Sequence, residues 1–434
     1  MEPGRLASSP DLQVLAAWQQ GYSGEGVLVA VLDNLFQTNH PNLSNSFYTV
    51  EQSNKCPGET FGWDFSTVAV GADFCRNGDS NPAINRAELS DLQEEWQDIF
   101  TLTDRNLVTK YASEVTVIQE ALSCQNDCSE AEIASRLRNQ FFLATIGEFH
   151  GTLVSGVIAA QPNEGTGLVG VAPNAKILPA RISMLGARGP SAASTFEAIG
   201  YVISRGADII NMSFGLPDEI VANRIQTALV NNPRLIFVAS AGNSGRPENA
   251  YPDRVFFPAA LDGVVAVGAT NLGGERAPYS NYGTDLDVVA PGGDLSFPNA
   301  NPKVGGLLTT GGTFLTGLWG DIEAVDPSQM FLDPQGQWIW IDGTSFSAPA
   351  VAGVLALMMS VDSHEQLTRE DFVEILQATA GYNRLQLSQG DRRRYEQLKD
   401  QGELPDDLAA EQYFFGDGLV DANAAVEAVR RRLE

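Results

Sequence analysis

Five short apolar runs recur along the chain, and each has the length of a buried β-strand. They are VLVAVL (27–32), KILPARI (176–182), ADIINMS (207–213), LIFVAS (235–240) and GVVAVGA (263–269). Helix-like stretches lie between most of them or after them, at 150–160, 191–205, 219–231, 347–360 and 420–432. Strands that alternate with helices predict a parallel sheet covered on both faces. The expected fold class is α/β, a three-layer α/β/α arrangement with a mostly parallel sheet.

Two segments interrupt this alternation, and we interpret both as insertions into one domain spanning 1–434. Residues 51–147 carry all four cysteines and a charged, helix-prone run, and 292–340 is rich in Gly, Asn, Pro and Trp. Ser129 followed by Glu132 matches a capping box, so a helix should begin there. Because the preceding helical run ends near Ser123, the first insertion is expected to contain a helical hairpin.

The cysteine spacing favours two local disulfides. Cys124 and Cys128 flank the predicted turn of the hairpin, and Cys56 with Cys75 would close a second short loop. Free thiols and a four-thiolate zinc site stay open as alternatives, although widely separated partners match the usual zinc spacing poorly. Local disulfides indicate an oxidising compartment.

Charge and hydropathy exclude several classes of partner. The chain has 434 residues, of which 43% are hydrophobic, and 27 basic residues against 54 acidic ones give a formal charge of −27. This balance argues against nucleic acid and anionic membranes as partners. No apolar run approaches the roughly 20 residues that span a bilayer, and the first ten residues lack the order of a secretory signal. We expect a secreted or extracytoplasmic protein, with a cytoplasmic location left open.

A hydroxyl residue stands at the start of the last buried helix, in GTSFSAP (343–349). Two interpretations of Ser345 stay open on this stretch alone. It caps the helix through a backbone N–H, with Pro349 tolerated in the first turn. Alternatively, it is a nucleophile placed where backbone N–H groups and the positive end of a helix stabilise an oxyanion.

A nucleophilic serine needs a base, and the chain has three histidines. His364 lies at a polar helix entry and His40 in a turn, whereas His150 opens HGTLVSGVIAAQ, where the following glycine allows close backbone approach. A buried structural histidine is the alternative for His150. Asp33 directly follows the first apolar run, at a strand end where α/β folds place functional side chains.

Asn243, in VASAGNSG, also follows an apolar run. Its amide can donate to an oxyanion, and a turn-forming asparagine is the alternative. Together these residues give the chain order Asp, His, Ser.

With these motifs the sequence resembles the subtilisin-like serine proteases, the subtilases. HGTLVSGVI and GTSFSAPAVAG match the histidine and serine motifs of that family, and the match covers roughly 20–50, 148–292 and 340–432. The resemblance implies that Asp33 orients His150, that His150 is the general base and acid, and that Ser345 is the nucleophile. It also implies an oxyanion hole made by Asn243 and the Ser345 N–H, with no organic cofactor.

Three residues depart from the family pattern. Asn34 and Leu35 follow Asp33 where the family has a small or acidic residue and then glycine, so the loop beside the acid should be arranged differently or the pocket narrowed. Phe346 follows the serine where many members carry Met. All four catalytic residue types remain.

The resemblance further implies a polypeptide substrate that pairs with backbone segments. The expected binding residues are Ser213, Phe214, Gly215, Ser240, Ala241 and Gly242. These residues suggest an apolar first pocket, although Glu248 and Asp253 leave a basic preference open.

Calcium is the one cofactor expected, as a structural ion. The family pattern places ligands at Asn42, Gln161 and Asn163, and Asn42 stands where a carboxylate is usual, which should weaken the site. Family members are usually made with an N-terminal prodomain. Only about 20 residues precede the core here, so a mature or trimmed form is expected, with a prodomain or inhibitor as a further partner.

These observations leave three candidate functions. The first is a serine endopeptidase, and the alternatives are a peptide transferase or macrocyclase with the same triad and a non-catalytic binding scaffold. The insertion, whose ends must lie near the cleft, is expected to act as a lid.

Overall fold

The structure, a computed structural model, describes most of the chain. It covers residues 11–434 except 52, 54, 122–127, 163–166, 188, 247–248, 250–251, 298–301 and 314–335. Cys124, Asn163 and Glu248 therefore lie outside the described residues.

A seven-stranded sheet forms the centre of the body, and all of its paired strands run parallel. The strand order is β2-β3-β1-β4-β5-β6-β7. The strands are β1 (Leu28–Asp33), β2 (Trp63–Asp64), β3 (Lys176–Arg181), β4 (Ile209–Met212), β5 (Ile236–Ser240), β6 (Val264–Thr270) and β7 (Val288–Pro291). All five predicted strands are present, with ends that differ by at most two residues, while the short β2 and β7 were not predicted.

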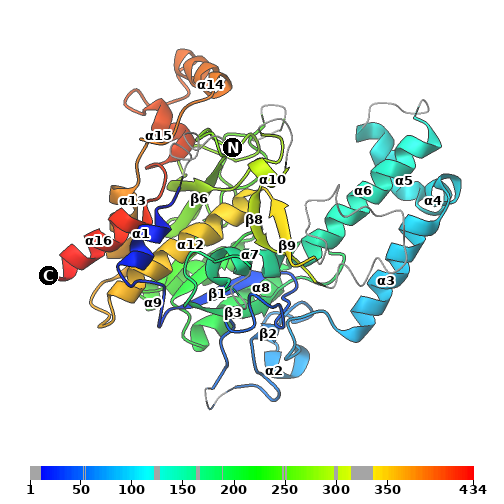
Figure 1. Cartoon of the computed structure of the whole chain (residues 1–434), viewed down its shortest axis with the longest axis horizontal. Helices are drawn as coiled ribbons and strands as arrows, with labels where there is room; N and C mark the ends of the chain where they lie inside the picture. Colours follow the sequence, from blue (N-terminus) through cyan, green and yellow to red (C-terminus); the bar gives the residue numbers. More distant parts are fainter. Residues whose placement is uncertain are drawn as a thin grey trace.

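Helices cover both faces of this sheet, as the three-layer prediction required (Figure 1). On one face α7 (His150–Ala159) contacts β1 and β3, and α12 (Thr344–Val361) contacts β4 to β7. On the other face α8 (Ala192–Ser204) contacts β1 and β3 and packs against α9 (Glu219–Asn231). Every residue of β1 is buried, which is expected of a central strand between two helical layers.

The remaining elements lie around this body. They are α1 (Val14–Gln19), α2 (Phe74–Asn77), α10 (Pro302–Gly305), α13 (Arg369–Thr379), α14 (Gln389–Asp400), α15 (Ala410–Phe415) and α16 (Ala422–Leu433), with β8 (Leu307–Thr310) antiparallel to β9 (Trp338–Ile341). The predicted loop insertion 292–340 thus contributes a helical turn and most of a small hairpin.

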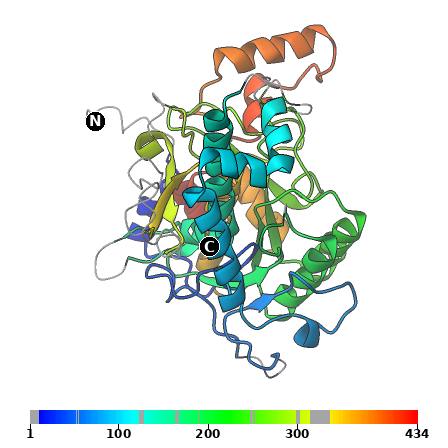
Figure 2. The ribbon, with the colours of Figure 1, turned by 90° about the vertical axis from the view of Figure 1, so that its right-hand side faces the viewer.

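The first insertion forms a helical arm that projects from the body (Figure 1) and is seen end-on in Figure 2. Its helices are α3 (Arg86–Thr101), α4 (Asp104–Lys110), α5 (Ala112–Ala121) and α6 (Glu130–Glu148). Trp96 lies at the centre of the arm, fully buried, with its ring centroid 4.6 Å from that of Phe100 and 5.7 Å from that of Phe141. This aromatic cluster gives the arm an apolar core of its own.

The predicted hairpin is present at α5 and α6. Ser129 and Glu132 form the capping box at the start of α6, and Cys128 is disulfide-bonded. Cys56 and Cys75 form the other predicted disulfide, with their Cα atoms 5.2 Å apart, so the zinc alternative is wrong for this pair.

The base of the insertion is tied to the body by a buried ion pair. Both carboxylate oxygens of Glu59 accept hydrogen bonds from Arg205 at 2.8 Å, and the Tyr201 hydroxyl donates to the same carboxylate at 2.7 Å. Arg205 caps the end of α8 and Tyr201 lies within it. Because all three side chains are buried, the geometry of the insertion relative to α8 is strongly constrained.

One described helix, Thr344–Val361, is apolar and long enough to cross a membrane, and α6 with α7 meets the same test as a pair bent by 52°. The apolar window of Thr344–Val361 is 83% buried, as expected of a core helix.

Candidate active site

Asp33 is the last residue of β1, and its side chain is only 4% exposed. Its two carboxylate oxygens lie 2.8 and 3.0 Å from Nδ1 of His150, the first residue of α7. Oδ1 also accepts the backbone N–H of Asn34 at 2.7 Å. The carboxylate therefore holds the proton of the imidazole on Nδ1 and leaves Nε2 unprotonated in the neutral ring.

The environment of His150 changes its basicity. Burial lowers the pKa of His150, but the charge of Asp33 and the hydrogen bond to it raise the pKa by more, so the net change is upward from 6.5. Phe346 faces the imidazole, with ring centroids 5.4 Å apart. The other histidines lie elsewhere: Nε2 of His40 is 3.0 Å from the carbonyl of Gln337, and His364 is exposed.

The loop after Asp33 is tied to the arm through Asn34 and Leu35, two of the residues that depart from the family pattern. Asn34 donates its side-chain amide to the carbonyl of Gly147 at 3.0 Å, and the N–H of Leu35 donates to the carbonyl of Glu148 at 3.0 Å. The Leu35 side chain is 1% exposed and packs in the core. This loop is therefore joined to the end of α6, and Leu35 does not line the pocket beside His150.

Ser345 lies in the first turn of α12, which begins at Thr344 and is capped by Gly343 without a side-chain hydrogen bond. The interpretation of Ser345 as a helix cap is therefore wrong, because α12 already includes it. Its Oγ donates instead to the carbonyl of Ser213, at 3.2 Å.

Pro349 explains how this contact is stabilised. A proline has no N–H, so the carbonyl of Ser345, four residues earlier, receives no hydrogen bond from position 349. The hydroxyl of Ser213 donates to that carbonyl at 2.8 Å. Ser213 and Ser345 are thus joined by two hydrogen bonds, one of which depends on the proline. The sequence predicted that Pro349 lies in the first turn of the helix. Because α12 begins at Thr344, the proline lies in the second turn.

The orientation of Asn243 is set by a neighbour that the sequence reasoning missed. Oδ1 of Asn243 accepts from the N–H and the hydroxyl of Thr344, at 2.9 and 2.8 Å. With its oxygen committed to Thr344, the neighbour of Ser345 in the chain, Asn243 keeps its Nδ2–H₂ as a donor, and the side chain is exposed. Tyr279 was also missed. Its hydroxyl accepts the N–H of Gly343 at 2.9 Å and so holds the residue that begins this turn. Both contacts join residues far apart in the sequence, and no local pattern signals them.

A pocket of about 550 Å³ opens beside the paired carboxylate and imidazole. Its lining includes Asp33, His150, Ser213 and Phe214, together with Glu148 from the arm. Asp33, His150 and Ser345 are therefore linked through this pocket and the Ser213 contact.

The predicted substrate-binding residues lie at the ends of neighbouring strands. Ser213 to Gly215 follow β4, and Ser240 to Gly242 close β5 and follow it. The ring of Phe256 packs behind Gly242, where an added Cβ would lie 2.8 Å from it, so this wall is apolar. Asp253 forms an ion pair with Arg394 at 3.0 Å. Its charge is therefore already partnered, which favours the apolar first pocket.

The residues expected to bind calcium are joined to one another by hydrogen bonds. Nδ2 of Asn42 donates to the carbonyl of Gln161 at 2.9 Å, and Oδ1 accepts from the indole of Trp338 at 2.8 Å. Within the described ranges, no group of three or more His, Cys, Asp or Glu side chains is placed to hold a metal ion. Asn42 and Gln161 offer only neutral oxygens, each already used once, which fits calcium poorly.

Comparison with known proteins agrees with this geometry. The Subtilase family model matches residues 24–402. A thermophilic serine proteinase from Bacillus sp. (strain AK1) is 32% identical over 212 residues, covering 49% of this chain and 42% of that protein. Subtilisin E from Bacillus subtilis (strain 168) is 32% identical over 237 residues, covering 54% of this chain and 51% of that protein. The chain thus spans about half the length of these relatives.

Solved structures share the fold over nearly the whole chain. A protease from Pseudoalteromonas arctica PAMC 21717 has a TM-score of 0.59 and 25% identity, covering 97% of this chain and 95% of that one. The prenylagaramide maturation protease PagA, at 19% identity and a TM-score of 0.52, covers 96% and 98% and supports the fold alone. With the family model matching most of its length, this chain belongs to the subtilase family.

Proposed function

We propose that the protein is a serine endopeptidase that hydrolyses peptide bonds through an acyl-enzyme intermediate. The observation that carries the proposal is the bond from Asp33 to Nδ1 of His150, at the mouth of a pocket whose Ser213 is hydrogen-bonded to Ser345. In this proposal Ser345 is the nucleophile, His150 the general base and acid, and Asp33 the group that orients the imidazole.

The reaction uses the hydroxyl that now bonds to Ser213. A rotation about χ1 of Ser345 turns Oγ from that carbonyl toward Nε2 of His150, which takes the proton as Oγ attacks the substrate carbonyl. The oxyanion that forms accepts hydrogen bonds from Nδ2 of Asn243 and the N–H of Ser345. His150 then returns the proton to the leaving amine, and water hydrolyses the ester by the same route.

The substrate is an extended polypeptide. Its backbone pairs with Ser213 to Gly215. The side chain of the residue whose carbonyl is attacked packs against the apolar wall formed by Ser240 to Gly242 and Phe256. A preference for apolar residues at that position follows from this wall. The arm, whose Glu148 lines the pocket, is proposed to restrict access by large folded substrates. An extracytoplasmic location is supported by the Cys56–Cys75 disulfide.

The first prediction concerns turnover and its products. In a peptide library read by mass spectrometry, the wild-type chain should release fragments with free carboxylates, and Ser345→Ala and His150→Ala should each abolish cleavage while circular dichroism stays unchanged. New amide bonds among the products would favour the transferase alternative. Near-normal cleavage by either variant would contradict the assignment.

The second prediction concerns pH. His150 must be neutral to act as a base, so kcat/KM should fall as the pH decreases through a pKa above 6.5. Asp33→Asn removes the charge that raises this pKa, so the acid limb should move to lower pH. The rate should also fall by roughly 10⁴-fold, the loss known for the equivalent change in a protease of another fold. An acid limb at the same pH in wild type and in Asp33→Asn would contradict the role of Asp33.

The third prediction concerns calcium, which we propose binds weakly at Asn42 and Gln161. Neutral oxygen ligands should give a dissociation constant of about 10⁻³ M or weaker, so the melting temperature should rise only at millimolar calcium. Asn42→Asp restores a charged ligand and should increase the rise. Identical melting temperatures of wild type in excess calcium and in chelator would contradict calcium binding.

A further inference from the structure

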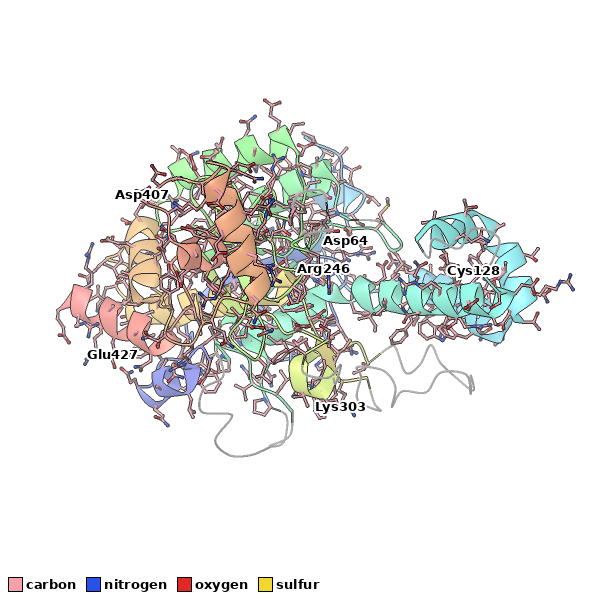
Figure 3. The ribbon with its side chains drawn as sticks, turned by 90° about the horizontal axis from the view of Figure 1, so that it is seen from above. Asp64, Cys128, Arg246, Lys303, Asp407 and Glu427 are labelled. Carbon is pink, nitrogen blue, oxygen red and sulfur yellow. A yellow bond between two sulfur atoms is a disulfide. The ribbon has the colours of Figure 1, made fainter. Side chains whose placement is uncertain are left out.

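A second and larger cavity lies between the arm and the body. Its volume is about 920 Å³, and it is lined by α3, α5 and α6 of the arm and by the body segments 64–67, 77–79 and 184–186. Figure 3 labels Asp64 on the body, at the base of the arm, and Cys128 at the far end of the arm. The cavity lies where the arm joins the body, and α6 of the arm contacts α7 of the body there (Figure 1).

The lining of this cavity is strongly acidic. Seven of its nineteen residues are Asp or Glu, against 54 of 434 in the whole chain, and none is Lys, Arg or His. The seven are Asp64, Asp79, Glu88, Asp91, Glu95, Glu114 and Glu148. The local excess of carboxylates is thus about three times what the composition of the chain would give.

Most of these carboxylates have no ion-pair partner in the described structure. Arg181, 1% exposed, pairs with Asp64 at 3.2 Å and with Glu88 at 2.6 Å. The other five form no ion pair with the described part of the chain. Their combined field favours a cation in the cavity.

The type of cation follows from how the carboxylates are spread. They come from several separate segments around the wall, and no three of them converge in the described structure as the ligands of a metal ion would. Dispersed carboxylates around a cavity of this size suit the extended, mobile side chains of lysine and arginine.

The acidic cavity adjoins the pocket beside His150. Ala144, Glu148 and Gly186 line both. Glu148 is the last residue of α6, and its Oε1 accepts the N–H of Gly186 at 3.0 Å. It therefore marks the junction between the two cavities, two residues before the proposed general base.

Glu148 occupies an electrostatically unfavourable place. It lies at the C-terminus of α6, where the negative end of the helix dipole repels a carboxylate. Burial raises its pKa, and the nearby charges of Glu88 and Glu95 also raise it, while the Gly186 N–H and Arg181 act in the opposite direction. A bound cation would relieve this repulsion.

Resting on the proposed function, we propose that Glu148 and the acidic cavity select substrates with basic side chains. In an extended peptide, successive side chains point to opposite sides. The side chain of the residue whose carbonyl is attacked packs against the apolar wall beyond Phe214. The residue before it therefore points into the pocket of His150 and Glu148, and a Lys or Arg there reaches the Glu148 carboxylate. Residues further toward the N-terminus extend into the acidic cavity.

The test compares peptides that differ only in charge at that preceding position, lysine against norleucine. Wild type should show a kcat/KM for the lysine peptide roughly tenfold higher, and the ratio should decrease with salt. Glu148→Gln keeps the size of the side chain and its acceptor for Gly186, and it should bring the ratio of the two kcat/KM values close to one. Glu130→Gln, the same change at the exposed start of the same helix, should keep the preference.

Binding separates this proposal from the proposed function. Fluorescence anisotropy with Ser345→Ala should give the same order of affinity, the lysine peptide binding more tightly, and the difference should vanish when Glu148→Gln is added. Charge-selective binding with no cleavage by the active chain would overturn the peptidase function alone. Equal binding and equal cleavage of the two peptides, or a preference that survives Glu148→Gln, would overturn the role of Glu148.

Discussion

The parallel direction of the strands is the constraint on which the rest of the structure depends. Because β1, β4 and β5 are parallel, their carboxyl ends meet at one edge of the sheet. Asp33, Ser213 and the Ser240–Asn243 segment therefore come together although they are separated by more than two hundred positions in the chain. The helices α7 and α12 begin at the same edge, which brings the first residue of one and the first turn of the other to these strand ends.

At that edge, backbone groups left without partners hold the site in place. Pro349 frees the carbonyl of Ser345 for the hydroxyl of Ser213, and Thr344 uses its N–H and hydroxyl to orient Asn243. Both arrangements use polar groups that would otherwise be costly to bury. A backbone hydrogen bond likewise joins the arm to the site, since the N–H of Leu35 donates to the carbonyl of Glu148.

Much of this was predictable because it is local. Buried parallel strands read as continuous apolar runs, so VLVAVL and LIFVAS could be located to within one or two residues. The capping box at Ser129 and Glu132 likewise predicted the start of α6. Strand β2, only two residues long, carries too little pattern to be recognised. The contacts of Thr344 and Tyr279 join distant segments, and the acidic cavity brings together carboxylates from separate segments of the chain. A sequence reveals the net charge of −27 but not where the carboxylates gather.

The central claim is that Ser345 is a nucleophile activated by the Asp33–His150 pair, and covalent labelling tests it most directly. A fluorophosphonate probe reacts with a serine only when its hydroxyl is activated, and mass spectrometry then locates the adduct. The account predicts one adduct, on Ser345, formed rapidly by wild type, much more slowly by Asp33→Asn, and not at all by His150→Ala. A chain that cleaves peptides yet carries the label on another residue, or labelling of Ser345 that is equally fast without His150, would contradict it.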